Sequence, residues 1–458
     1  ARWRVFFIEG SSPFPQNSVF SVSIIPVFSV FANVMLRCRF RLICDIIVIN
    51  NRDRIKSSSG FSYMQKGIVH KMDLTYFDNS ATTQPCEQAV KKIEEMLTAC
   101  WGNPSSLHSL GFAAEEELNE ARRAVAKSLS CMPEEVYFTS GGTESDNLAI
   151  FGAAKARQKR GMHIVTTQIE HPAVLNTMAA LEKEGFTITY LAPDSEGHIS
   201  AQAVREAVRP DTILVSLMAV NNEVGTILPV ETARDAIREQ NAPALLHVDA
   251  VQAYGKLPLA PGRQGIDLMT VSAHKIHGPK GVGALFVKKG VHIAARVFGG
   301  GQERNLRPGT EGMPLIAGFG AAVRVLPDLA AEEERIRALN RRLRERLAGM
   351  GGVTIHSPED ALPYILSFSA CPVRAETMLH FLSERGICVS SGSACAKGKA
   401  SHVLTAMRLP KEQIESSLRV SFSRNNTEQE VDALADALAE GLSTLAARSS
   451  LRARLKKS

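Results

Sequence analysis

Short apolar runs alternate with amphipathic stretches along most of this chain, and this alternation limits how it can fold. Between residues 135 and 287, strand-like runs are separated by stretches with helical periodicity, such as 143–161 and 172–185. Parallel strands joined by helices bury both faces of one sheet. The sequence therefore predicts an α/β fold with a mainly parallel, seven-stranded sheet between helices. The predicted strands are 135–139, 163–167, 187–191, 212–218, 244–249, 268–272 and 283–287.

A smaller α+β domain is predicted after Gly312, where the pattern changes. One long charged helix is expected over about 314–350, followed by a helix at 374–385 and a final helix from Thr427. Strands are expected near 353–355, 364–368 and 419–422. We place a large domain at 84–330, and a small domain at 72–83 and 331–458.

Residues 1–71 do not resemble the rest of the chain. They carry ten Lys/Arg and only three Asp/Glu, so the formal net charge of +6 originates there. The apolar run 19–36 suggests a membrane or signal segment but is interrupted by polar residues and Pro26. An Arg-rich organelle presequence is a second interpretation. We favour a disordered or upstream-translated extension, with Met72 as the natural start.

Charge and cysteine content exclude several functional classes. Because the basic residues are concentrated before Met72, the body of the chain gives no argument for nucleic-acid binding. Its eight cysteines form no C-x-x-C pair and have no regular spacing, which argues against a disulfide framework and a structural zinc site. Free thiols indicate a reducing compartment, and we expect a cytoplasmic protein.

The segment 272–281 (SAHKIHGPKG) joins two predicted strands and contains Lys275. A lysine buried at a strand end loses hydration, which favours the neutral amine that forms Schiff bases. Ser272 and His274 flank it with groups that can bind an anion. Taken alone, this lysine is equally well explained as a solvated turn residue.

Three other strand ends carry candidate functional residues. Residues 138–147 (FTSGGTESDN) join a strand to a helix through a glycine pair, which makes an anion cradle at Gly142 and Thr143. Asp249 ends another strand, where ligands collect in parallel sheets. His171 follows a third strand, where a structural histidine is the simpler interpretation.

Together these segments resemble the fold-type I pyridoxal-phosphate (PLP) enzymes, and among them the cysteine desulfurases of the NifS/IscS type. The resemblance runs from about Asp73 to the last helix. Its motifs are 76–83 (YFDNSATT), 139–147 (TSGGTESDN), 170–171 (EH), 221–225 (NNEVG), 247–249 (HVD), 272–281, 299–304 (GGGQER), 307–310 (RPGT) and 390–395 (SSGSAC). Gly142 departs from the alanine of many relatives, a change expected to leave the cradle working.

The resemblance implies roles for individual residues around PLP. Lys275 would hold the cofactor and move protons, Asp249 would keep the ring nitrogen protonated, and His171 would stack on the ring. Arg419 would pair with the substrate carboxylate. The remaining implied contacts are Asn222 and Gln252 to the cofactor or its substrate adduct, and Gly142, Thr143, Ser272 and His274 around the phosphate.

Cys395 separates this activity from that of a transaminase. The resemblance implies that its thiolate attacks the sulfur of L-cysteine, which leaves a persulfide on Cys395 and releases L-alanine. The site itself would hold no metal, although the persulfide would transiently ligate an iron–sulfur cluster. A selenocysteine lyase or transaminase, and a sulfur-transfer scaffold without cofactor, are the competing interpretations.

The resemblance also implies partners. Thr310 would reach the phosphate bound by a neighbouring subunit, which predicts a homodimer with shared active sites. An iron–sulfur scaffold or a tRNA-thiolation protein would accept the sulfur. Neither direct nucleic-acid binding nor membrane binding is expected.

Overall fold

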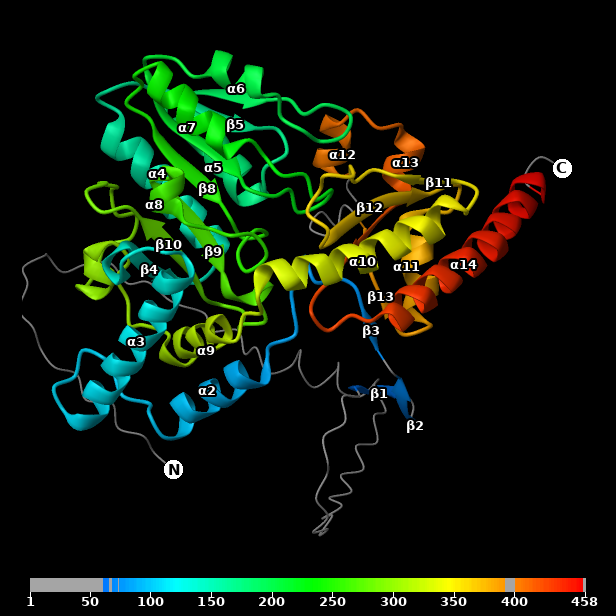
Figure 1. The fold of residues 1–458 in the computed structure, drawn as a ribbon, viewed down its shortest axis with the longest axis horizontal. Coiled ribbons are helices and arrows are strands. Elements are labelled where there is room, and N and C mark those ends of the chain that lie inside the picture. Colours follow the sequence, from blue (N-terminus) through cyan, green and yellow to red (C-terminus); the bar gives the residue numbers. More distant parts are fainter. Residues whose placement is uncertain (1–60, 66–67, 73, 392–399, 456–458) are drawn as a thin grey trace, which may run out of the picture. The chain divides into compact units, whose positions relative to one another are not determined.

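The seven-stranded sheet forms the centre of the large domain in a computed structural model, which describes residues 61–65, 68–72, 74–391 and 400–455 (Figure 1). Its strand order is β4-β10-β9-β8-β7-β5-β6. Only β10 runs antiparallel to its neighbours. The strands are β4 (Val136–Thr139), β5 (His163–Thr167), β6 (Thr187–Leu191), β7 (Thr212–Met218), β8 (Leu245–Asp249), β9 (Leu268–Ser272) and β10 (Gly283–Val287). The predicted seven-stranded, mainly parallel sheet is confirmed, with the β4 and β8 starts shifted by one residue.

Both faces of this sheet are buried, because successive side chains of a strand point to opposite sides. Ile164 and Leu214 join one apolar cluster with residues of α4 (Gly142–Arg157) and α5 (Pro172–Lys183). Their neighbours Val165 and Val215 join a second cluster. This second cluster includes residues of α3 (Ser109–Ser128), α7 (Val230–Glu239) and α9 (Met313–Arg324), and α9 also packs against α2 (Glu87–Thr98). Two shorter helices, α6 (Ala201–Ala207) and α8 (Pro261–Gln264), complete the connections.

A four-stranded antiparallel sheet, ordered β11-β12-β15-β14, forms the small domain. Strand β3 (Thr75–Tyr76) pairs with β13 (Ile387–Cys388) in parallel. The segment around residue 75 is therefore part of the C-terminal region of the fold. The sheet strands are β11 (Val353–Ile355), β12 (Ile365–Ala370), β14 (Ser390–Ser391) and β15 (Ser417–Ser421). The helices are α10 (Leu329–Ala348), α11 (Ala375–Ser383), α12 (His402–Ala406), α13 (Lys411–Glu415) and α14 (Glu428–Leu455).

The single helix predicted over 314–350 is wrong, because the chain breaks between α9 and α10. Pro327 has no N–H for a helical hydrogen bond, and Asp328 caps α10 by accepting from the Ala331 N–H at 2.9 Å. The two helices meet at 83°. In the described part of the chain, no single helix is long and apolar enough to cross a membrane. The bent pair of α9 and α10 reaches that length and apolarity only when its two helices are counted together.

The end of the predicted N-terminal extension lies among the described residues, and the interpretation of residues 1–71 as a disordered or upstream-translated extension stays a prediction. Strands β1 (Phe61–Gln65) and β2 (Ile68–Met72) form an antiparallel hairpin that includes the expected start, Met72. The apolar run 19–36 and the rest of residues 1–60 lie outside the described residues.

A buried ion pair ties α3 to the strand that leads into the functional site. Arg122 donates to both carboxylate oxygens of Glu303 at 2.7 and 2.8 Å, and to the Val136 carbonyl at 2.7 Å. Glu303 also accepts from the Phe138 N–H at 2.9 Å. Arg122 and Glu303 are 8% and 6% exposed, so neither charge has solvent to replace its partner.

Replacing Glu303 with Ala is expected to lower the free energy of unfolding by about 3 kcal/mol, because it leaves the buried Arg122 charge unpaired. Urea denaturation followed by circular dichroism measures this. Glu120→Ala is the matched control, since it breaks an exposed pair with Arg123 on the same helix and should change stability little. Equal effects of the two changes would contradict the prediction.

Candidate active site

A cavity of about 250 Å³ lies at the C-terminal ends of the parallel strands. Three strand ends supply part of its wall through Met218, Asp249 and Ser272. Ten residues predicted from the sequence line it: Gly142, Thr143, His171, Asn222, Asp249, Gln252, Ser272, His274, Lys275 and Arg419. Residues from 142 to 419 therefore meet at one site.

Two predicted residues are not placed in this cavity. Cys395 lies outside the described residues. Thr310 lines a different cavity, together with Arg307 and Glu303. Arg307 donates to the Glu144 carboxylate at 2.8 Å, which ties this segment to the first turn of α4. The role expected for Thr310 concerns a second subunit and stays a prediction.

Lys275 ends a short 3-10 turn, Ala273–Lys275, directly after β9. Its Nζ donates to the Ala81 carbonyl at 2.8 Å and to the Ser80 carbonyl. Both acceptors belong to the loop that follows β3 and lie almost two hundred positions earlier in the chain. The lysine is therefore held against the cavity wall, unlike a turn lysine surrounded by solvent.

Three buried carboxyl groups lie close enough to interact near the cavity. Burial raises the pKa of Asp249, although His171, the Val251 N–H and Lys275 oppose the rise. Burial, reinforced by the Asp249 charge, raises the pKa of Asp146 well above its usual value. Burial also raises the pKa of Glu170 to about 8. With Asp146 and Glu170 biased toward their neutral forms, Asp249 can carry the negative charge at less electrostatic cost.

The two predicted site histidines favour their neutral forms. Burial lowers the pKa of His171, with further lowering by Lys275 and His402 and an opposing effect of Asp249. Its Nδ1 accepts from the Ala173 N–H at 3.1 Å, so the neutral ring carries its proton on Nε2. Burial and neighbouring lysines lower the pKa of His274 to about 4. Neutral rings in these positions can stack on or hydrogen-bond to a ligand.

A second pocket adjoins the cavity at the start of α4. Gly142, Thr143, Ser272 and His274 line both spaces, and Lys280 adds a cation to the adjoining region. The buried Ser272 Oγ has no hydrogen-bond partner among the described residues. A Cβ on Gly142 would lie 2.9 Å from Val251 Cγ2, so an alanine there would require Val251 to shift. The region combines a helix N-terminus, hydroxyls and a cation, as anion sites do.

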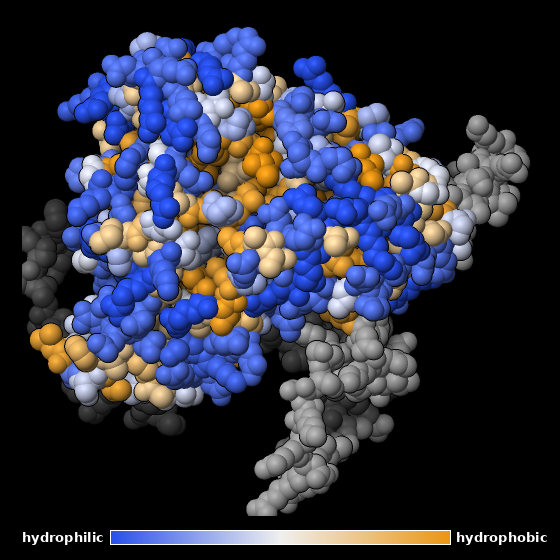
Figure 2. Space-filling view, viewed as in Figure 1, coloured by the Kyte–Doolittle hydropathy of each residue, from blue (hydrophilic) through white to orange (hydrophobic). Residues whose placement is uncertain are grey.

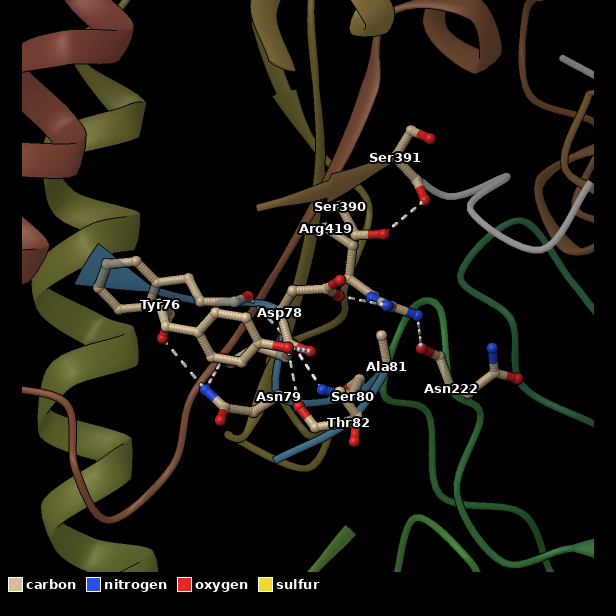
Figure 3. A network of polar contacts seen from close by, with 12 residues as sticks. Tyr76, Asp78, Asn79, Ser80, Ala81, Thr82, Asn222, Ser390, Ser391 and Arg419 are labelled. Carbon is tan, nitrogen blue, oxygen red and sulfur yellow. Dashed lines mark hydrogen bonds and ion pairs between the residues drawn. The ribbon is translucent and has the colours of Figure 1, made fainter. Parts of the chain in front are cut away.

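Arg419 projects from β15 into a polar network, which Figure 3 shows in close-up. It donates to Asp78 Oδ1 at 2.9 Å and to the Asn222 carbonyl at 2.9 Å. Its buried Nε has no hydrogen-bond partner among the described residues. At 4% exposure, this guanidinium is fixed in orientation, and three of its five N–H groups, including that of Nε, donate to no described residue.

Sequence reasoning missed Ser80, Ala81 and Asp146 as members of the site. Ser80 and Ala81 contact Lys275 through their backbone carbonyls, and because every residue has a carbonyl, the sequence does not predict this role. Asp146 had a readable signal, since it follows Gly142 by four positions on α4 and therefore lies on the same helical face. Its closeness to Asp249 depends on how α4 packs on the sheet, so the sequence does not predict it.

Comparisons with known proteins place this geometry in a family. The pattern of the class-V aminotransferases matches residues 75–434. A putative cysteine desulfurase, IscS 1 of Bacillus subtilis, is 42% identical over 375 residues, which cover 81% of this chain and 98% of the relative. The chain belongs to the NifS/IscS-type cysteine desulfurases of the class-V aminotransferases. The family and fold expected from the sequence are thus confirmed.

Other desulfurases and solved structures agree with this assignment. IscS of Serratia proteamaculans is 44% identical, covering 78% of this chain and 90% of the relative. A NifS-like protein of known structure superposes with a TM-score of 0.76 at 39% identity, over 81% of this chain and 99% of that one. A structure described as SspA in complex with cysteine has a TM-score of 0.68 at 36% identity, over 76% and 98% of the two chains.

Glu170→Gln is expected to weaken the pH dependence of stability. Glu170 holds its proton in the folded protein up to about pH 8, whereas 4.5 is its ordinary value. Its contribution to stability is therefore fully present below pH 4.5 and is lost as the pH rises through about 8. Between these limits, the free energy of unfolding of the wild type should fall by about 4 kcal/mol more than that of the variant.

Urea denaturation at a series of pH values measures both slopes. Glu182→Gln is the control, because Glu182 is an exposed glutamate of α5 and its replacement should leave the wild-type slope. Equal slopes for wild type and Glu170→Gln would mean that Glu170 is already ionised in the folded protein.

Proposed function

We propose that this chain is a PLP-dependent L-cysteine desulfurase. It would convert L-cysteine to L-alanine and leave a persulfide on Cys395. The observation that carries the proposal is the meeting of Lys275, Asp249 and Arg419 in one cavity of a protein that belongs to the cysteine desulfurase family. These three side chains supply an amine, a carboxylate and a carboxylate-binding cation.

The residues of the cavity fit PLP. Lys275 would bind it covalently, and Asp249 would pair with its ring nitrogen. The unpartnered Ser272 Oγ, Thr143, His274 and the start of α4 would hold the phosphate. Neutral His171 would lie on the ring, and Asn222 and Gln252 would contact it or the substrate. When bound, PLP withdraws electrons from the substrate's reacting carbons.

The remaining chemistry belongs to the chain itself. Arg419 would bind the substrate carboxylate, and Lys275 Nζ would take the proton from the adjacent carbon. The Cys395 thiolate would then attack the substrate sulfur. A sulfur–sulfur bond forms, the carbon–sulfur bond breaks, and its electron pair stays with the carbon fragment, which is protonated and leaves as alanine.

Incubation of the full-length chain with L-cysteine tests the proposal directly. We expect alanine by chromatography and, by mass spectrometry, a gain of one sulfur on the Cys395 peptide. The variant Cys395→Ala should lose sulfur transfer, whereas a selenocysteine lyase or transaminase would keep most of its turnover. Cofactor-loaded protein that yields neither alanine nor persulfide would disprove the proposal.

We also propose a homodimer whose subunits share active sites through Thr310. Apolar side chains exposed on the single chain support an interface, namely Trp101, Leu107, Phe112, Val297 and Phe298. In Figure 2, orange hydrophobic residues appear among mostly blue hydrophilic ones, and some of them lie where Figure 1 shows α2 and α3. Sedimentation at twice the mass of one chain is expected.

The sulfur would pass to an iron–sulfur scaffold or a tRNA-thiolation protein. A cytoplasmic location agrees with the five cysteines that the described residues contain, all of them free.

Arg419→Lys is expected to raise the KM for cysteine by about 30-fold, with a smaller change in kcat. Lysine keeps a positive charge near Asp78 but lacks the planar fork that binds a carboxylate through two hydrogen bonds. Steady-state alanine formation measures both constants. Arg385→Lys, at an exposed pair with Glu440, serves as the control. An unchanged KM would remove Arg419 from the substrate site.

A further inference from the structure

Glu223 is a buried acidic residue to which the proposed reaction assigns no task. It follows Asn222, whose carbonyl accepts from Arg419, in the turn after β7. Its carboxylate accepts a hydrogen bond from the buried hydroxyl of Ser401. The turn is held by Asn221, whose Oδ1 accepts from the Glu223 N–H at 2.9 Å. The carboxylate therefore connects the turn beside Arg419 to a residue 178 positions later in the chain.

The start of α12 is attached to the large domain by two side chains. Ser401 precedes the first turn of this helix, and its Oγ accepts from the Leu404 N–H at 3.1 Å while it donates to Glu223. The next residue, His402, donates through Nε2 to the Glu170 carbonyl at 2.9 Å. Both acceptors belong to loops of the large domain, so the helix start is fixed across the two domains.

The segment that carries Cys395 lies between β14 and α12 in the chain, and both of these elements are held near Arg419. In β14, Ser390 lies opposite Arg419 of the antiparallel strand β15. On the other side, Ser401 follows Cys395 by six positions and is bonded to Glu223, in the turn that contacts the same arginine. Since an extended chain advances at most about 3.6 Å per residue, the position of Ser401 limits the positions open to Cys395.

We propose that Glu223 is a positioning residue for Cys395. By holding Ser401, it keeps the chain that follows Cys395 on the large domain, at the turn that contacts Arg419. A substrate bound by Arg419 and a thiol tethered through Ser401 are then kept within reach of each other, which raises the rate of their reaction. This inference rests on the proposed function, because the position of Cys395 matters only if its thiolate attacks the substrate. Glu223 itself touches neither cofactor nor substrate in this scheme.

The test is the rate of persulfide formation on Cys395 in a single turnover of the full-length, cofactor-loaded chain, followed by mass spectrometry. Burial raises the pKa of Glu223 to about 7, so assays at about pH 8 examine mainly the carboxylate. We expect Glu223→Ala to slow persulfide formation by about 30-fold. The absorption change on cysteine binding should keep its wild-type concentration dependence. Glu223→Gln keeps an oxygen that can accept from Ser401 and should recover most of the rate.

Two further variants separate this contact from a general effect on helix capping. Ser401→Ala removes the donor of the same bond and should also slow persulfide formation, and the double variant should be no slower than the slower single one. Ser200→Ala is the matched control. Ser200 likewise caps a short helix, α6, by accepting from the Ala203 N–H, but it does not line the cavity. This control should keep the wild-type rate.

A folded Glu223→Ala protein with the wild-type rate of persulfide formation overturns the inference and leaves the proposed function intact. Cysteine binding that weakens as much as the rate falls also overturns it, because that result indicates a general structural role. If Glu223→Ala does not fold, Ser401→Ala decides by the same comparison. A wild-type chain that binds cysteine but forms no persulfide instead disproves the proposed function, and this inference with it.

Discussion

Lys275→Ala is expected to lower alanine formation from L-cysteine by about 10⁴-fold or more. Two functions are lost together, since Lys275 would hold the cofactor and would also take the substrate proton. Among the described residues, it is the only lysine that lines the cavity with Asp249 and Arg419. Neither Lys256 nor Lys280 borders that space, so neither is placed to substitute. Alanine quantified over time, with added PLP, measures the loss.

Two further variants separate chemistry from structure. Lys275→Arg keeps a cation that can donate to the Ser80 and Ala81 carbonyls, so the fold should persist while the activity is lost. Lys289→Ala removes an exposed lysine of the same domain and should retain wild-type activity. Substantial turnover in Lys275→Arg would assign the reaction to another amine.

The fold was largely predictable because its strands depend on local patterning. Each buried strand reads as a short apolar run, and the seven runs matched the sheet almost residue by residue. The helix break before Leu329 was missed because helix-forming sequence lies on both sides of it, apolar in α9 and charged in α10. The signal was present in Pro327 and Asp328, which stop one helix and cap the next.

In the active site, only residues whose side chains have a characteristic chemical use could be predicted from the sequence. Lys275, Asp249 and Arg419 have side chains with specific uses, and motif resemblance grouped them before the structure did. The Ser80 and Ala81 carbonyls reach Lys275 through the pairing of β3 with β13 and the bridge between Asp78 and Ser421. That contact depends on tertiary structure across most of the chain. Burial, which alters the protonation of Glu170 and Glu223, is likewise a property of the folded molecule.

Asp249→Asn is expected to reduce alanine formation by about 10³-fold while leaving the protein folded. Asn keeps an oxygen that can accept from the Val251 N–H, a bond that is 2.9 Å long here. It lacks the negative charge that would hold a proton on the ring nitrogen, so electron withdrawal from the substrate would weaken. Asp249→Glu restores the charge and should recover part of the activity.

The position of Asp249 provides a matched control within the same sheet. Asp267 lies just before β9, at the opposite end of the strands, and accepts from the Leu246 N–H at 3.0 Å. Asp267→Asn therefore changes the same functional group far from the cavity and should retain wild-type turnover. The visible absorption of lysine-bound cofactor should remain in Asp249→Asn, because Lys275 is intact. Loss of that absorption would mean that Asp249 serves binding, whereas its retention together with slow turnover assigns the carboxylate to the chemical step.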